Sequence, residues 1–153
     1  MVEQKTKEAK AVIIDGKDLI LGRMGSKIAK RLLMGEEIKI VNCKDIIMLG
    51  KKKFLVQRYK EKISNKVVKQ GPYYDRSPAD IVKRSMRNML PYKNERGKLA
   101  FSRLKCYNST PSTLLNVEKE ELKEVVLNED TVFYYTRIGE LCAALGYDKH
   151  MRK

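Results

Sequence analysis

The strongest constraint on the fold comes from residues 11–41, where two short apolar runs flank an amphipathic segment. The apolar runs lie at 11–15 and 38–41, and each has the length of a buried strand. The segment at 22–34 spaces Ile28 and Leu32 four residues apart, and a glycine follows its end, as at the end of a helix. A strand, a helix and a second strand in this order favour parallel pairing. The sequence therefore predicts an α/β fold.

Further helices and strands are expected along the rest of the chain. The clearest helix start is Ser77-Pro78-Ala79-Asp80, where we expect Ser77 to cap the helix and Pro78 to occupy its first position. Leu55, Tyr59 and Ile63 form the apolar stripe of the helix that precedes it. The expected helices lie at 51–62, 78–91, 97–104, 118–126 and 137–145, the expected strands near 105–107 and at 131–135, and a loop at 64–75.

The length of the chain, 153 residues, favours a single domain. Residues 1–10 are polar and predict a flexible arm, and residues 11–153 predict one folded domain. The arm does not resemble a signal peptide, and no apolar run approaches the ~18 residues of a membrane helix, so a soluble intracellular protein is expected. Three cysteines without a C-x-x-C pair argue against a disulfide framework or a zinc site and indicate buried thiols in a reducing compartment.

Positive charge is concentrated in the middle of the chain. Residues 51–107 hold 17 Lys or Arg and four acids, so this stretch carries +13 of the formal net charge of +14. Repulsion of this size destabilises an isolated protein, and it is expected where the surface faces a polyanion such as RNA or DNA.

Catalysis finds little support in the residue types present. The one histidine, His150, lies three residues from the end, where a general base is hard to hold in place. The acidic residues form no convincing metal or glycosidase pair. We therefore expect no enzyme, no cofactor, no bound metal and no small-molecule substrate.

Gly22 and Gly25 allow three interpretations. Their spacing matches the G-x-x-G loop of KH RNA-binding domains, although such a loop joins two helices. They also fit a strand-to-helix turn whose free N–H groups meet phosphate, or a turn that is merely tight. The patterns of a Walker loop and of a dinucleotide fingerprint both fail.

Structured RNA fits the basic stretch better than DNA does. Pro91 interrupts the pattern that a helix-turn-helix reader would need. Arginines suit phosphate contact and base stacking, and Tyr73 and Tyr74 offer aromatic surface for stacking. The alternative for these tyrosines is that they cover the core.

Several motifs carry a family resemblance. The run from Gly71-Pro72 to Arg76-Ser77-Pro78, followed by Arg87-Asn88-Met89-Leu90-Pro91-Tyr92-Lys93-Asn94-Glu95-Arg96-Gly97-Lys98, resembles the central motif of the universal family of large-subunit ribosomal protein thirteen. Two further blocks agree with it, Gly22–Ser26 with Ala29-Lys30 and Leu32-Leu33, and Ile40–Cys43. The resemblance covers residues 12–111. Asn88 and Ser109 stand where the family has glycine, and Asn88 tolerates a left-handed conformation if that position requires one. Arg96-Gly97 and Leu141-Cys142 are similar to the archaeal and eukaryotic branch.

The resemblance implies a three-layer α/β/α fold with a small, mostly parallel four-stranded sheet. It also implies a structural protein of the cytoplasmic large ribosomal subunit that binds rRNA, contacts neighbouring ribosomal proteins and supports subunit assembly and translation. The alternatives are a regulatory RNA-binding module of the KH type and a nucleotide-binding enzyme. We expect the acidic segment at 118–126 to face solvent or a basic neighbour. The predicted RNA contacts are Arg76, Lys83, Arg84, Arg87, Lys93, Arg96, Lys98 and Arg103, with Arg23 and Lys27 in second rank.

Overall fold

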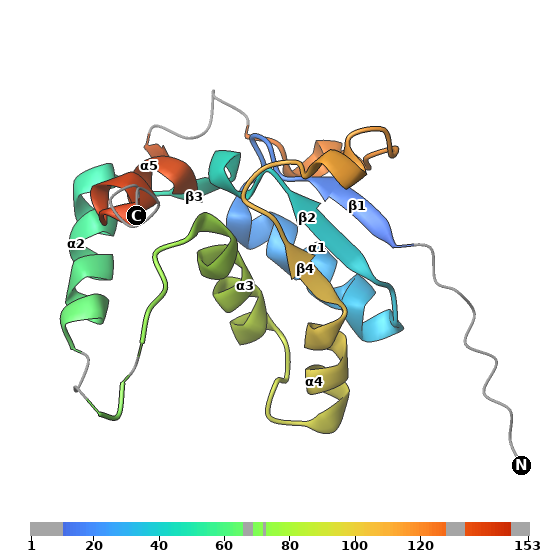
Figure 1. The fold of residues 1–153 in the computed structure, drawn as a ribbon, viewed down its shortest axis with the longest axis horizontal. Coiled ribbons are helices and arrows are strands. Elements are labelled where there is room, and N and C mark those ends of the chain that lie inside the picture. The colour runs from blue at the N-terminus through green and yellow to red at the C-terminus, as the bar shows by residue number, and fades with distance from the viewer. Residues whose placement is uncertain (1–10, 66–68, 72, 128–133, 148–153) are drawn as a thin grey trace, which may run out of the picture.

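The computed structural model describes residues 11–65, 69–71, 73–127 and 134–147 (Figure 1). The arm predicted at 1–10 and His150 lie outside the described residues. The elements are β1 (Val12–Asp15), α1 (Leu21–Met34), β2 (Ile38–Val41), η1 (Cys43–Asp45), β3 (Ile47–Leu49), α2 (Lys52–Ser64), α3 (Pro78–Met89), α4 (Glu95–Ser102), β4 (Leu104–Cys106), η2 (Ser112–Leu114), η3 (Lys123–Val125), β5 (Tyr135–Arg137) and α5 (Ile138–Ala144), where η marks a 3-10 turn.

The main sheet is parallel and has the strand order β1-β2-β4. Ile40 of β2 lies opposite Ile14 of β1 and Cys106 of β4. On the outer edge of β1, Glu120 forms a single parallel bridge with Ile14, so the fourth position of the sheet is filled by one residue. The strands β3 and β5 form a separate antiparallel pair. The α/β class with mostly parallel pairing is confirmed; the parallel sheet has three strands where four were expected.

Side chains along the strands point alternately to the two faces of the main sheet, and both faces are apolar. Ile14, Ile38 and Ile40 belong to the main core together with the buried stripe of α1 and side chains of α3. The opposite face carries Ile13 and Val41. Within the described residues Leu114 of η2 and the half-buried Tyr107 pack on that second face, so its cover includes a 3-10 turn. Figure 1 shows α1 crossing behind the sheet and α4 leading directly into β4.

The helices α2 and α5 pack against each other at the end of the molecule that carries β3 (Figure 1). Leu55 of α2 is buried with Leu141 and Leu145, and Tyr59 and Ile63 pack partly against them. The apolar stripe predicted for α2 is therefore confirmed. No helix in the described part of the chain is both long enough and apolar enough to cross a membrane.

The predicted helix at 118–126 is wrong. Glu120 pairs with the edge of β1: its N–H donates to the carbonyl of Ile13 at 2.8 Å. The chain then forms only the 3-10 turn η3, which buries Val125 completely. Backbone pairing at an open sheet edge and burial of one valine outweigh the weak helical preference of the segment.

Other boundaries differ in smaller ways. The strand β5 starts at Tyr135 and includes Arg137, which was assigned to the last helix; residues 131–133 of the expected strand lie outside the described residues. The helix α4 begins at Glu95, two residues before the predicted start, and β3 was not predicted. Asn88 lies within α3 and has no positive φ, so a left-handed conformation is not what permits asparagine there.

Candidate nucleic-acid interface

The helix α3 is the scaffold of the candidate interface, and its start is fixed by a distant residue. The backbone N–H of Ala79 donates to Oδ1 of Asn108 at 2.8 Å, and the Ser77 hydroxyl donates to the same oxygen at 3.2 Å. Nδ2 of Asn108 in turn donates to the Tyr147 hydroxyl at 3.0 Å. Ser77 occupies the N-cap position and Pro78 the first helical position, as expected, but the Ser77 side chain makes no capping hydrogen bond. Asn108 satisfies the helix N–H group instead, because it approaches from the end of β4.

The helix α3 separates apolar from basic residues. Ile81, Val82 and Met86 are buried in the core, while Lys83 is exposed and Arg84 and Arg87 are half-buried. This arrangement follows from the helical period, which places residues four apart on one face. The three cations of α3 therefore stand at its boundary with solvent, as the sequence predicted.

These three cations line a cavity of about 280 Å³. The walls also include Lys62 and Tyr59 of α2, Tyr74 of the loop before α3, and Phe101 of α4. Two acids, Asp75 and Asp80, line it as well. With four cations and two carboxylates on its walls, the cavity has a net positive charge.

Stacked contacts hold the arginines of α3. The Arg84 guanidinium lies 3.7 Å from the Tyr74 ring centre, and its Nη1 donates to the Tyr73 carbonyl at 3.1 Å. Tyr73 itself is 62% exposed, so it does not cover the core. Arg87 lies over the Tyr92 ring at 5.2 Å, and Lys83 over the Phe101 ring at 5.5 Å. Planar groups held in this way suit contact with bases and phosphates.

Arg87 contains the one polar side-chain atom that, among the described residues, is buried without a hydrogen-bond partner. This atom is Nε, a donor that cannot lose its proton at ordinary pH. A buried donor without an acceptor destabilises a protein by ~1–3 kcal/mol. An acceptor supplied from outside the chain would remove this cost.

The turn after α3 and the helix α4 carry the next group of cations. Lys93, Arg96 and Lys98 are exposed, whereas Arg103 is half-buried and its Nη1 is 3.4 Å from the Leu32 carbonyl. The turn is tight because Gly97 packs directly on the backbone of Pro91, where a Cβ would overlap the carbonyl group. The Pro91 and Gly97 of the sequence motif thus set the angle at which α4 leaves α3.

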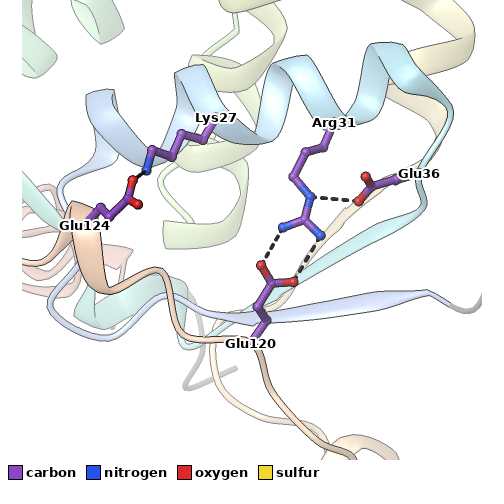
Figure 2. Close-up of polar contacts among 5 residues, drawn as sticks. All are labelled: Lys27, Arg31, Glu36, Glu120 and Glu124. Atoms are coloured by element: carbon purple, nitrogen blue, oxygen red, sulfur yellow. Dashed lines mark hydrogen bonds and ion pairs between the residues drawn. The ribbon is translucent and has the colours of Figure 1, made fainter.

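The other predicted contacts lie elsewhere. Arg76 lies beside Gly146, just after the end of α5. A Cβ added to Gly146 would be 3.5 Å from Nη1 of Arg76. Arg23 is exposed on α1 and lines a second cavity of about 460 Å³ together with Arg58 and Lys62. Lys27 forms an ion pair with Glu124, so its charge is already compensated within the protein (Figure 2).

The acidic segment of the last third forms ion pairs with two basic residues of α1, Lys27 and Arg31 (Figure 2). Arg31 donates to both carboxylate oxygens of Glu120, at 2.8 and 3.0 Å, and to Glu36 at 2.7 Å. The hydrogen bond to Glu120 is the main cause of the raised pKa of Arg31, and the hydrogen bond from Lys27 lowers the pKa of Glu124. The acidic segment was expected to face solvent or a basic neighbour. Instead, Glu120 and Glu124 pair with α1 of the same chain. The partners are 89 and 97 residues apart, so no short sequence spacing could have indicated them.

Gly22 and Gly25 lie inside α1 and do not form a loop between two helices. This contradicts the KH interpretation. Gly22 is the second residue of α1, so its N–H belongs to the first turn of the helix, while Gly25 lies further in. Gly25 is buried, and a Cβ there would overlap the sulfur of Met89. Gly25 therefore lets α1 and α3 approach closely, which is a packing role.

Sequence reasoning did not assign several cavity-lining residues to the site, among them Tyr59, Lys62, Asn88, Phe101 and the two acids Asp75 and Asp80. Tyr59 was recognised only as part of an apolar stripe, and its burial raises the pKa of its hydroxyl.

All three cysteines are among the described residues and carry free thiols. Cys43 and Cys142 are buried as expected, whereas Cys106 is half-buried, and contact with Cys106 together with burial raises the pKa of Cys43.

The fold and the interface define a small α/β protein with a basic helix pair, α3 and α4, built around a tight Pro91–Gly97 turn. A family model described as ribosomal protein L13 matches residues 9–113. Relatives named large ribosomal subunit protein uL13 include those of Methanopyrus kandleri, 39% identical over 137 residues (88% of this chain and 86% of the relative), and Methanocaldococcus jannaschii, 42% identical over 138 residues (88% and 96%). A third, from Archaeoglobus fulgidus, is 39% identical over 136 residues (88% and 87%). The chain belongs to the ribosomal protein L13 family.

Proposed function

We propose that this protein is a structural constituent of the large ribosomal subunit, where it binds rRNA and supports subunit assembly and translation in the cytoplasm. Membership of the ribosomal protein L13 family is the observation that carries this proposal. The relatives are named as proteins of the large subunit, and we extend that role to this chain. Neighbouring large-subunit proteins are its further expected partners. We treat residues 11–153 as one folded domain and residues 1–10 as an arm.

The proposed RNA contacts are those of the basic helix pair. The exposed side chains of Lys83, Lys93, Arg96 and Lys98 support this assignment, because they are accessible to phosphate without breaking an ion pair seen in the described residues. Neutralising phosphates at this surface lets RNA helices pack without mutual repulsion. The remaining proposed contacts are Arg76, Arg84, Arg87 and Arg103, with Arg23 as a second-rank contact; Lys27 would first have to exchange Glu124 for phosphate.

The electrostatic part of the proposal is tested by salt. With about 6–10 phosphate contacts, affinity for large-subunit rRNA falls by ~10³–10⁵ between 50 and 200 mM salt on the scale measured with DNA. A filter-binding titration over this range measures the slope. A response that is flat across the range would overturn the proposal.

Charge reversal then tests the location. Arg87→Glu and, separately, the exposed Lys98→Glu should each weaken rRNA binding and lower the salt slope by about 1, with circular dichroism unchanged. The matched control is Lys17→Glu, an identical charge reversal at an exposed site in the turn between β1 and α1. Equal losses for all three variants would mean that net charge alone matters and that α3 and α4 are not the contact surface.

Assembly is tested in cells. Tagged protein from an extract should sediment with the large subunit, and the Lys98→Glu variant should shift toward the free fraction. Sedimentation only as free protein would contradict the structural role.

A further inference from the structure

The cavity beside α3 has features that a surface for phosphate alone does not need. Phosphate contact requires exposed cations, which α4 already supplies. The cavity instead is an open hollow of about 280 Å³ that combines cations with the aromatic residues Tyr59, Tyr74 and Phe101. Its volume lies close to the lower end of the ~300–1,000 Å³ of small-molecule sites, which suits one nucleotide better than a longer segment of RNA.

The contact between Tyr74 and Arg84 provides a stacking platform. The guanidinium lies 3.7 Å from the ring centre and is tied to the Tyr73 carbonyl, so two planar groups are held together at the cavity wall. Unpaired bases in RNA stack on aromatic rings and on arginine planes. A pair that is ordered before binding gives up less side-chain entropy when a base arrives.

Arg87 indicates that an acceptor is missing from the chain. It lines the same cavity, and its buried Nε has no hydrogen-bond partner among the described residues. A base carbonyl, a ring nitrogen or a phosphate oxygen in the cavity would supply an acceptor to the Arg87 guanidinium, and the buried Nε would be reached when the side chain shifts toward the ligand.

Two carboxylates also line the cavity. Asp75 and Asp80 leave its walls net positive and provide acceptors that an inorganic anion could not use. Carboxylates accept hydrogen bonds from the amino groups of bases, and Asn88 on the same wall can both donate and accept. The lining therefore suits a ligand that has both an amino-bearing base and a phosphate.

We propose that this cavity is a subsite for one unstacked rRNA nucleotide, whose base lies against the Tyr74–Arg84 platform and whose acceptor pairs with Arg87. The proposal rests on the proposed rRNA-binding function and deepens it. It assigns the cavity to a nucleotide extruded from its helix, while the exposed cations of α4 contact the phosphate backbone.

Substitution of Tyr74 in the full-length chain separates stacking from charge. Tyr74→Leu removes the ring and no charge, so affinity for large-subunit rRNA should fall roughly 10-fold or more while the salt slope stays unchanged. Tyr74→Phe keeps the ring and should bind as the parent does. Lys98→Gln is the electrostatic counterpart, and it should lower both affinity and slope. A thermal unfolding curve for each variant shows whether it is folded.

The outcomes separate the two proposals. If the parent does not bind rRNA at all, the proposed function fails. If the parent binds and Tyr74→Leu binds equally well, or loses affinity only with a reduced slope, the nucleotide subsite is overturned and the function stands. Ultraviolet cross-linking of the parent complex should give adducts on Tyr59, Tyr74 or Phe101, and adducts confined to other residues would overturn the subsite.

A free nucleotide shares the chemistry of an extruded one, so its binding is measured separately. Mononucleotides of all four bases at about 1 mM, the upper end of common KM values, should leave the unfolding temperature unchanged, since one nucleotide lacks the flanking backbone contacts. A clear upward shift that Tyr74→Leu abolishes would assign the cavity to a soluble nucleotide and overturn the RNA subsite.

Discussion

The Arg31 guanidinium donates to both carboxylate oxygens of Glu120, at 2.8 and 3.0 Å, and so ties the last turn of α1 to a segment 89 residues further along the chain. Glu120 also extends the main sheet through its bridge with Ile14. One residue therefore joins the sheet edge to the helix that crosses the sheet. Together with Glu124 on Lys27, it neutralises a face of α1 within the protein.

Glu120→Gln should lower the free energy of unfolding by about 1 kcal/mol, because it removes a bidentate charge-assisted pair at a partly exposed site. Arg31 keeps Glu36, which limits the loss. Urea denaturation at low salt measures the effect, and 1 M salt should reduce it. Glu118→Gln is the control, since Glu118 is exposed and forms no ion pair within the described residues. Equal effects of the two substitutions would contradict the role of the pair.

Acidification should weaken the contact between α1 and the 118–125 segment. The hydrogen bond from Lys27 lowers the pKa of Glu124 below its ordinary value. Because the pKa of Glu124 is lower in the folded state than in the unfolded state, the ion pair stabilises the fold at neutral pH. This stabilisation is lost when the pH falls below about 4 and the folded carboxylate becomes protonated. Carbon-detected NMR titration should find the low pKa in the parent and in Lys27→Arg, and a value close to ordinary in Lys27→Met. An unchanged pKa in Lys27→Met would show that the ion pair is not its cause.

Asn108→Ala should destabilise the protein by about 1–2 kcal/mol, because α3 loses the acceptor at its first turn. Asn108→Asp keeps that acceptor and loses only the donor to Tyr147, so it should retain most of the stability. Thermal unfolding measures both variants, with the exposed Ser109→Ala as control. If the alanine and aspartate variants were equally unstable, the cap would not be the cause.

Two glycine substitutions should have opposite signs. Gly97→Ala should cost about 1–3 kcal/mol, because its Cβ overlaps the Pro91 carbonyl group and backbone must move. Gly22→Ala should stabilise by about 0.5–1 kcal/mol, since it lies in α1 with nothing within 4 Å of the added carbon. Chemical denaturation of both variants tests this. A stabilising Gly97→Ala would mean that the Pro91–Gly97 turn relaxes freely.

The local elements could be predicted from the sequence where their periodicity is strong. The spacing of Ile28 and Leu32 gave α1, and two apolar runs gave β1 and β2 with their parallel pairing. The segment at 118–126 was misassigned because an acidic stretch with Leu122, Val125 and Val126 at helical spacing resembles a helix, whereas its actual conformation depends on the open edge of β1. The basic face of α3 was predictable, since charge on one side of a helix is a local pattern.

The cavity was not predictable in the same way. Its walls come from α2, from the loop before α3 and from α4, and nothing in the spacing of Tyr59, Tyr74 and Phe101 brings them together. The cap by Asn108 likewise joins residues 29 apart. Contacts of this kind arise when the chain closes around its core, and a local pattern does not contain them.

By itself, the sequence determined the α/β class, the positions of the main helices and the concentration of positive charge in residues 51–107, because periodicity and composition act over a few residues. Only the tertiary structure decided which cations remain available. Lys27 and Arg31 are paired with Glu124 and Glu120. The cations of α3 instead line a cavity that contains more basic than acidic side chains. The physical reason is that an ion pair needs its two groups within a few ångströms, and folding alone sets that distance.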